Sequence, residues 1–378
     1  MASDGPAHPV VRRVLQRLLL SSILLQSLLL AVSQAQLITL DGSLGPGGPL
    51  AGPNYRIGAE LGQIRGSNLF HSFGQFNVPT GGSATFAGPN TIANIVNRVT
   101  GGQQSVIDGL LRSEILGANL YLLNPSGVLF GPNASLDVSG SFHVSTADFL
   151  RFGDGAKFSA HLGQESVLTV ASPTAFGFLG NNPAGIGVQG GMLQVREGKA
   201  LSAVGGDVQI VGGRLLALSG RVQIASVASP GEVVFSPLEL APDLQVNSFA
   251  RLGRLELSKN ALLNVRGNGG GTVLLRSGRL LVDQSFILAD NTGSVNGTGL
   301  GMDLQVTADA VIANGSFLTT DSFGAGRARD LRLTAGSLHL DNALAGSRSF
   351  ASGDGGNVGV NVGTLRLTGG PRSAPIQT

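Results

Sequence analysis

The fold is decided by Asp303-Leu-Gln-Val-Thr-Ala-Asp-Ala-Val-Ile-Ala-Asn314, which recurs as Asp330-Leu-Arg-Leu-Thr-Ala-Gly-Ser-Leu-His-Leu-Asp341. A third copy, Asn357-Val-Gly-Val-Asn-Val-Gly-Thr-Leu-Arg-Leu-Thr368, follows at the same offset of 27 residues (330 − 303 and 357 − 330). Each copy reads as two alternating strands joined at a polar or glycine turn. One unit of this size cannot bury its apolar face, so successive units must stack as a solenoid of parallel strands.

The offset also predicts which side chains stack. Leu331 and Leu333 are expected to lie above Leu304 and Val306 and below Val358 and Val360. The same register extends upstream, where two further sets of four residues are expected to match Leu304, Val306, Val311 and Ala313, each in this order. The nearer set is Val273, Leu275, Leu280 and Val282, and the farther set is Val208, Ile210, Leu215 and Ala217.

Other repeat folds fit less well. A propeller blade needs about 40–45 residues, and a leucine-rich repeat needs a helical or consensus-asparagine segment in each unit. The calcium-binding β-roll repeat is disfavoured because the glycine runs Gly269–Gly271 and 353–356 lack its aspartate in the right place. At about 27 residues per coil, the chain predicts roughly a dozen coils, with residues 36–75 as the N-terminal cap that covers the exposed strand edge.

The composition favours a turn-rich exported chain. It has 58 glycines among 378 residues, no cysteine, 13% charged residues and a net charge of +2, whereas soluble domains carry about 25% charged residues. The basic residues are scattered and aromatics make up only 5%, so the chain lacks the basic stripe and stacking rings of a nucleic-acid-binding protein.

Residues 1–35 read as a secretory signal peptide. Arginines 12, 13 and 17 precede an apolar stretch, residues 18–32, and small residues at Ser33 and Ala35 predict cleavage that leaves Gln36 as the new N-terminus. The alternative is a permanent membrane anchor, but the stretch is interrupted by polar residues and shorter than the roughly 20 residues that spanning requires. We therefore expect export through the Sec translocon into the periplasm.

Five segments, in this order, resemble the two-partner-secretion (haemagglutination activity) domain of filamentous-haemagglutinin-type exoproteins, especially cyanobacterial ones. They are Asn68-Leu-Phe-His-Ser-Phe-Gly-Gln-Phe-Asn-Val78, Ile95-Val-Asn-Arg-Val-Thr-Gly-Gly102, Ile107-Asp-Gly109, Ala118-Asn-Leu-Tyr-Leu-Leu-Asn-Pro-Ser-Gly-Val-Leu-Phe-Gly-Pro-Asn-Ala134 and Ala225-Ser-Val-Ala-Ser-Pro-Gly-Glu-Val233. The resemblance covers residues 36–235, and residues 236–378 continue the same solenoid. We expect either that residues 371–378 cap its end or that the sequence is the front of a longer reading frame. With the repeat, it gives an all-β fold, a right-handed parallel β-helix of the pectin-lyase-like type with an N-terminal β cap.

The resemblance implies a recognition segment. The family's Asn-Pro-Asn-Gly-Ile motif matches Asn124, Pro125, Ser126, Gly127 and Val128, with serine in the third place. These are turn residues, since proline fixes φ and glycine permits a positive φ. Together with Asn97, Arg98, Thr100 and Gly101, the turn is expected to form or support the surface that an outer-membrane transporter reads. The alternative is that these residues only hold the coil in shape.

The rival class is a β-helical polysaccharide lyase or glycosidase, which needs carboxylates that converge on one groove. Asp303 and Asp330 would be equivalent in neighbouring coils, but the next equivalent is Asn357 and all three begin strands. The histidines show no metal-ligand spacing and are expected at the surface or in turns. We therefore predict no enzyme, no cofactor and no metal site.

A second rival is a passenger exported by a barrel in the same chain. The function predicted is that of a secreted exoprotein, exported to the cell surface through a β-barrel transporter with periplasmic recognition domains. Its exposed rod would bind a host or cell-surface receptor, a role that rests on family analogy alone.

Overall fold

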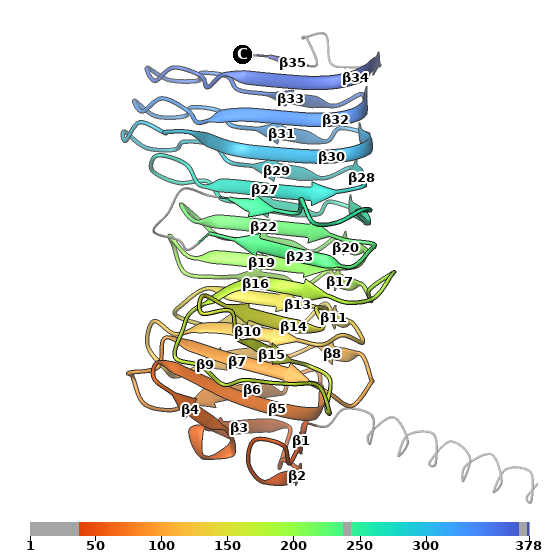
Figure 1. The fold of residues 1–378 in the computed structure, drawn as a ribbon. Coiled ribbons are helices and arrows are strands. Elements are labelled where there is room, and N and C mark those ends of the chain that lie inside the picture. Colours follow the sequence, from red (N-terminus) through yellow and green to blue (C-terminus); the bar gives the residue numbers. More distant parts are fainter. Residues whose placement is uncertain (1–37, 237–242, 370–375, 378) are drawn as a thin grey trace, which may run out of the picture.

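The computed structural model describes residues 38–236, 243–369 and 376–377. Figure 1 shows a rod of stacked coils, with β1 near one end and β34 near the other. The predicted signal peptide and its cleavage site between Ala35 and Gln36 lie outside the described residues. In the part of the chain that is described, no helix is both long and apolar enough to cross a membrane.

The first face of the solenoid is a column of parallel strands that pair from coil to coil. Its members are β5 (Asn68–Phe76), β7 (Asn94–Val99), β10 (Asn119–Leu123), β13 (Phe142–Ser145), β19 (Ala200–Gly205), β22 (Arg221–Ser226), β27 (Thr272–Ser277), the first part of β30 (Leu300–Ala313), β32 (Asp330–Asp341) and β34 (Val358–Thr368).

The second face continues each coil after a corner, and its strands are also parallel. They are β8 (Ser105–Ile107), β11 (Val128–Phe130), β17 (Ile186–Gln189), β20 (Val208–Val211), β25 (Arg254–Ser258), β28 (Arg279–Asp283) and the second part of β30. In the C-terminal coils the first and second faces merge into the single long strands β30, β32 and β34.

The third face closes each coil and is an 11-stranded parallel sheet. Its strands are β3 (Asn54–Gly58), β6 (Ser83–Ala87), β9 (Leu110–Ser113), β12 (Ser135–Asp137), β18 (Met192–Gln194), β21 (Arg214–Leu216), β26 (Leu262–Asn264), β29 (Phe286–Leu288), β31 (Phe317–Thr319), β33 (Leu344–Gly346) and β35 (Ile376–Gln377). One strand per coil gives eleven levels in the described part, close to the dozen predicted. The repeat and the three parallel faces confirm the predicted parallel β-helix.

An antiparallel cap closes the N-terminal end. β1 (Ile38–Asp41) pairs antiparallel with β2 (Gly47–Pro49) and with β5, and β4 (Gln63–Arg65) also pairs antiparallel with β5. A short 3-10 helix, Ala59–Leu61, follows β3. Because β3 and β5 already pair parallel with the next coil, the cap and the first coil share strands.

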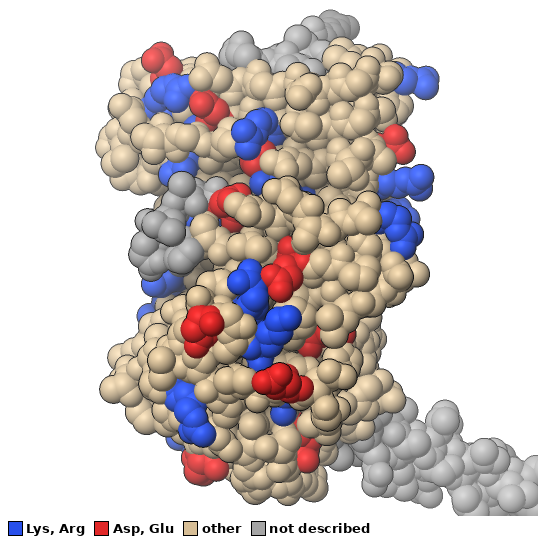
Figure 2. Space-filling view, viewed as in Figure 1, with Lys and Arg blue, Asp and Glu red and all other residues tan. Residues whose placement is uncertain are grey.

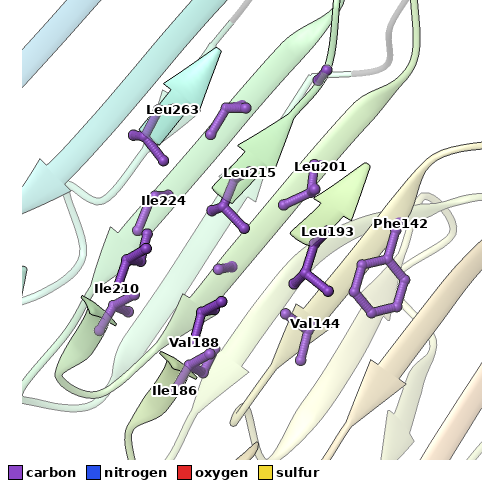
Figure 3. Packing of buried hydrophobic residues seen from close by; sticks show 14 of the residues in the cluster. Phe142, Val144, Ile186, Val188, Leu193, Leu201, Ile210, Leu215, Ile224 and Leu263 are labelled. Atoms are coloured by element: carbon purple, nitrogen blue, oxygen red, sulfur yellow. The ribbon is translucent and has the colours of Figure 1, made fainter. Parts of the chain in front are cut away.

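The interior is a continuous stack of aliphatic and aromatic side chains. Alternate residues point inward, so Val188, Ile210 and Leu257 follow one another on the second face while Leu193, Leu215 and Leu263 do so on the third. Figure 3 shows several of these side chains meeting between the faces. Burying each such side chain contributes about 1.5–3 kcal/mol, so the stack supplies the stability that disulfides give other exported chains.

The predicted register is wrong by two residues in the first strand of the unit. Leu304 pairs with Leu333 and Val306 with Ala335, an offset of 29 residues (333 − 304), and the predicted neighbour Leu331 pairs with Met302. The same side chains still face inward, because side chains alternate between the two faces of a strand and a slip of two residues does not change which of them are buried. The partners Leu331–Val358 and Leu333–Val360 are as predicted.

A bulge between Val306 and Asp309 makes the second strand slip by only one residue. Ala310 and Ile312 are therefore the buried residues that correspond between coils, in place of the predicted Val311 and Ala313. Val311 is only half-buried. Upstream, Val273 and Leu275 pair with Met302 and Leu304, and Leu280 and Val282 with Ala310 and Ile312. The set predicted from Val208, Ile210, Leu215 and Ala217 is also wrong, because Val208 and Ile210 belong to the second face and Leu215 to the third.

A five-stranded antiparallel sheet, which the sequence analysis did not anticipate, covers part of the first face. It comprises β15 (Lys157–Ser159), β14 (Phe149–Phe152), β16 (Pro173–Phe178), β23 (Gly231–Phe235) and β24 (Leu244–Gln245). In Figure 1 these strands lie in front of the first-face strands. Phe152, Phe158 and Phe176 bury Phe70 and Tyr121 of the first face in a second apolar core. We call this the covering sheet.

Candidate functional site

The turn Asn124–Gly127 joins β10 on the first face to β11 on the second. The N–H of Gly127 donates to the Asn124 carbonyl at 3.0 Å, and the N–H of Ser126 donates to Asn124 Oδ1 at 2.9 Å. These two bonds define a β-turn with an asparagine side chain closing it. Gly127 has φ +105°, and a Cβ added there would lie 3.3 Å from the carbonyl oxygen of Gly185 in the following coil.

The Asn124 side chain is fully buried and ties the turn to the preceding coil. Its Nδ2 donates to the Gln103 carbonyl and to Ser105 Oγ, each at 2.9 Å. The side chain of Ser126 is half-buried, and its hydroxyl makes no hydrogen bond with the described residues. Asn124 therefore fixes the turn, while Pro125 and Ser126 form its outer surface.

Asn97 lies one coil earlier and points into the solenoid. Its Nδ2 donates to the Tyr121 carbonyl at 2.8 Å, and its Oδ1 faces His71 Nδ1 at 3.1 Å. His71 Nε2 lies 3.2 Å from the Gly58 carbonyl across the interior. This chain of contacts links strands β3, β5, β7 and β10 inside the apolar core, so Asn97 holds coils together and is not exposed.

Burial dominates the electrostatics of His71, since desolvation lowers its pKa to about 4. His143 is also buried and stacks on Tyr121 with ring centroids 4.4 Å apart, and burial lowers its pKa to about 3. The prediction that the lone histidines lie at the surface or in turns is wrong for both. The burial of His71 could be recognised only from the alternation of inward-facing residues along β5, and that of His143 only from the covering sheet.

Arg98 points outward, where the covering sheet and the cap bury it. Its Nε donates to Ser72 Oγ at 2.7 Å, one Nη donates to Ser43 Oγ at 2.9 Å, and the other donates to the Ser159 carbonyl. The guanidinium lies over the Phe158 ring, 4.6 Å from its centroid. Arg98 thus joins the cap, the first face and the covering sheet.

Asp41 of the cap completes this junction and was missed by the sequence analysis. Its Oδ2 accepts hydrogen bonds from Ser72 Oγ at 2.5 Å and Thr100 Oγ1 at 2.7 Å. Burial alone would raise the pKa of Asp41, but hydrogen bonds from Ser72, Ser43 and Thr100 outweigh it and lower the pKa below its ordinary value. Only the fold brings Asp41 to Thr100, 59 residues away in sequence.

The structure brings the two predicted segments together at one corner. β7 pairs with β10 so that Asn97 lies beside Leu122 and Arg98 beside Leu123. A Cβ at Gly101 would lie 2.0 Å from the Gly74 carbonyl oxygen, so only glycine fits there. The exposed part of this corner is residues 101–104, next to the half-buried pair Pro125 and Ser126. We call residues 101–104 and 124–127 the recognition corner.

The two acids that the sequence aligned, Asp303 and Asp330, do not converge on one groove in the described part of the chain. Asp303 and Asp330 are not equivalent in the structure, because Asp303 pairs with Arg332 and Asp330 pairs with Leu300. Asp148 pairs with His161 at 2.5 Å and Asp137 with Arg112 at 3.2 Å. Among residues 38–236, 243–369 and 376–377, no three His, Asp or Glu side chains are placed to hold a metal ion.

The charges on the outer surface are mixed in sign. Figure 2 shows Lys and Arg side chains interspersed with Asp and Glu on one face of the rod. Ion pairs among the described residues include Arg56–Glu114 at 2.9 Å and Arg151–Glu232 at 2.7 Å. This face offers no continuous basic stripe of the kind that tracks a phosphate backbone.

Comparison with known proteins identifies the family. Residues 54–275 match the family described as the TPS secretion domain. The chain belongs to the TPS secretion domain family. As a member it is a secreted two-partner-secretion exoprotein, and the predicted resemblance to filamentous-haemagglutinin-type exoproteins is confirmed. The likeness to cyanobacterial members stays a prediction.

Two solved secretion domains are among the structural matches. The HMW1 secretion domain from Haemophilus influenzae has 16% sequence identity and a TM-score of 0.53, over 81% of this chain and 81% of that chain. The filamentous hemagglutinin secretion domain has 16% identity and a TM-score of 0.32, over 91% of this chain and 99% of that chain. The HMW1 match supports the β-helical fold. No curated protein matches the chain.

Proposed function

We propose that a cognate outer-membrane β-barrel transporter recognises this TPS secretion domain at the recognition corner and exports it to the cell surface. The observation that carries this proposal is the corner itself. Two segments of neighbouring coils meet there, and the buried side chain of Asn124 joins them by donating to the Gln103 carbonyl. The exposed Gly101–Gln104 loop is then presented in one fixed shape to the transporter's periplasmic domains.

Folding after export would follow the coil order. Each new coil adds parallel backbone pairing and buries apolar side chains on the coil before it, as Leu263 does on Leu215. Stability of such a solenoid is approximately a sum over neighbouring coils. Stacking therefore releases free energy stepwise and can draw the chain outward without ATP.

The route before the transporter is the Sec translocon and the periplasm, and the exported rod would act in adhesion by binding a host or cell-surface receptor. The proposal includes no catalytic activity. Both oxygens of the Asp303 carboxylate are held by arginines, so this buried acid is not available as a general acid or base.

The test is secretion from a Gram-negative host with and without a matching transporter. We expect transporter-dependent release into the medium, which the double variant Gln103→Ala, Gln104→Ala reduces. These side chains are exposed, so the variant should fold normally. Gln209→Ala, an equally exposed glutamine on the second face, is the matched control and should be released like the original chain.

Two further variants separate recognition from shape. Asn124→Ala and Gly127→Ala alter the turn that supports the corner, and their folding is checked by circular dichroism on refolded protein. Folded variants that are not released support recognition at this corner. Release without any transporter, or equal release of all variants, would contradict the proposal.

A further inference from the structure

A groove of about 670 Å³ lies where the third face leads into β22, β27, β30 and β32. Loops of successive coils form one wall, and Asp243, next to β24 of the covering sheet, contributes to the other. Four arginines line the groove, namely Arg221, Arg276, Arg329 and Arg332, against two aspartates, Asp243 and Asp303. Its volume falls in the range of small-ligand sites.

Asp303 is neutralised within the wall. Arg276 Nη2 donates to its Oδ2 at 2.7 Å, and Arg332 reaches both oxygens, at 2.9 Å and 3.0 Å. Burial alone would raise the pKa of Asp303, but these arginines outweigh it and lower the pKa below its ordinary value. One carboxylate is thus shared by two guanidinium groups, and Asp243 also stabilises the charge of Arg276.

Arg329 is held in the groove by neutral groups. Its Nε donates to the Gly269 carbonyl at 2.9 Å and its Nη1 to Thr272 Oγ1 at 3.4 Å. Within the described part of the chain, no carboxylate lies within ion-pair distance of this guanidinium. Burial lowers the pKa of Arg329 below its ordinary value, yet arginine stays protonated in proteins. The groove therefore holds a partly buried positive charge without a described counter-charge.

The neighbouring coils make room for this side chain. A Cβ at Gly297 would lie 2.6 Å from Arg329 Cγ, and one at Gly301 would lie 2.8 Å from Arg329 Cβ. The stem of Arg329 crosses the coil of β30 and reaches Thr272, 57 residues earlier in the chain. Gly297 and Gly301 leave the space through which the Arg329 side chain passes. The side chain is therefore held in one position, and its guanidinium is preorganised.

We propose that this groove binds an acidic polysaccharide, with Arg329 and Arg332 contacting its anionic groups. Arginine presents a planar fork of donors that matches the oxygens of carboxylate or sulfate groups. The remaining lining includes Thr298, Gln305 and Ser219, whose hydroxyl and amide groups suit sugar hydroxyls. The groove crosses several coils, each about 4.8 Å apart, so it fits an extended chain of sugars.

We assign binding without glycosidase cleavage to this groove. Both oxygens of Asp303 are occupied by arginines, which leaves Asp243 as the one other lining carboxylate in the described part. A glycosidase needs two carboxylates flanking the scissile bond. This site is distinct from the recognition corner, so its ligand and the transporter would bind independently.

The experiment measures binding of fluorescent oligogalacturonate, dextran sulfate oligomers and neutral maltohexaose to the purified chain by anisotropy. We expect at least one of the two acidic chains to bind, with the affinity falling as salt rises, and maltohexaose to bind far more weakly. The two acidic probes distinguish carboxylate from sulfate as the preferred group.

Three variants locate the site. Arg329→Gln should weaken binding about tenfold or more, since it removes a charged hydrogen-bond donor. The exposed Thr298→Glu leaves every arginine in place and should weaken binding by a similar factor, because it puts a carboxylate beside the anionic ligand. Arg279→Gln removes an equally charged, exposed side chain on the second face and should change binding little.

Several outcomes would overturn the proposal. They are no binding to either acidic probe, equal binding of maltohexaose, and equal loss in Arg279→Gln, which would indicate nonspecific charge attraction. If Arg329→Gln does not fold, Thr298→Glu alone decides between these outcomes. Shortening of the oligosaccharides during the assay would overturn the assignment of binding without cleavage.

Discussion

Asp303 on β30 and Arg332 on β32 face each other in neighbouring coils, and the Arg332 guanidinium holds both oxygens of the Asp303 carboxylate, at 2.9 Å and 3.0 Å. On the other side, Arg276 of the preceding strand β27 donates to the same carboxylate at 2.7 Å. The side chains of Asp303 and Arg276 are 4% and 3% exposed, whereas that of Arg332 is 50% exposed. One buried acid thus links three consecutive coils.

Asp303→Asn should destabilise the solenoid by about 3–5 kcal/mol, because it removes the carboxylate that forms an ion pair with the buried Arg276. The midpoint of urea unfolding measures this loss. Asp309→Asn is the matched control, since Asp309 pairs with Arg279 at 3.7 Å on the exposed surface, and it should cost less than about 1 kcal/mol. Equal midpoints for the two variants would show that the buried pair contributes no more than a surface one.

The buried His71 makes stability depend on pH. Its folded pKa is about 4 against an ordinary value of 6.5, so between these values the unfolded chain binds a proton that the folded chain does not. Stability is therefore fully present above pH 6.5 and is lost as pH falls toward 4, by about 3 kcal/mol at 1.36 kcal/mol per pKa unit. His143 acts in the same direction.

His71→Gln removes one of these two contributions. The variant should be less stable than the original chain at neutral pH, but its urea midpoint should fall less between neutral pH and about pH 4.5. The quantity to compare is the change in midpoint with pH, which does not depend on the absolute cost of the substitution. If the urea midpoint of the variant depended on pH as strongly as that of the original chain, His71 would be protonated in the folded state or accessible to solvent.

The fold could be predicted from the sequence because its main signal is local. Alternation in Asp303–Asn314 and Asp330–Asp341 gave strands, and repetition gave stacking. The register could not be predicted, since alternation is unchanged by a slip of two residues, and the bulge between Val306 and Asp309 has no local signature.

The covering sheet was missed although a signal for it exists. Leu120, Tyr121, Leu122 and Leu123 form a continuous apolar run, which indicates a strand that is buried on both faces. The same omission explains why Arg98 was assigned to a surface. Its burial depends on Ser159 of the covering sheet and Ser166 in the segment after β15, more than 60 residues later in the chain. The turn at 124–127, by contrast, was placed by Pro125 and Gly127 alone.

Within that turn, Asn124 and Ser126 should differ sharply in their contribution to stability. Asn124→Ala removes the side chain that accepts from the Ser126 N–H and donates to the Gln103 carbonyl and Ser105 Oγ, leaving buried groups unpaired at a cost of about 1–3 kcal/mol. Ser126→Ala removes a hydroxyl that makes no hydrogen bond to the described residues. Ser126→Asn introduces the residue of the family motif. The free energy of unfolding of both variants should stay within about 0.5 kcal/mol of that of the original chain. Thermal and urea unfolding of the three variants test this order. If Asn124→Ala were as stable as Ser126→Ala, the turn would be held by Pro125 and Gly127, and the hydrogen bonds of the buried Asn124 side chain would not be what fixes the corner.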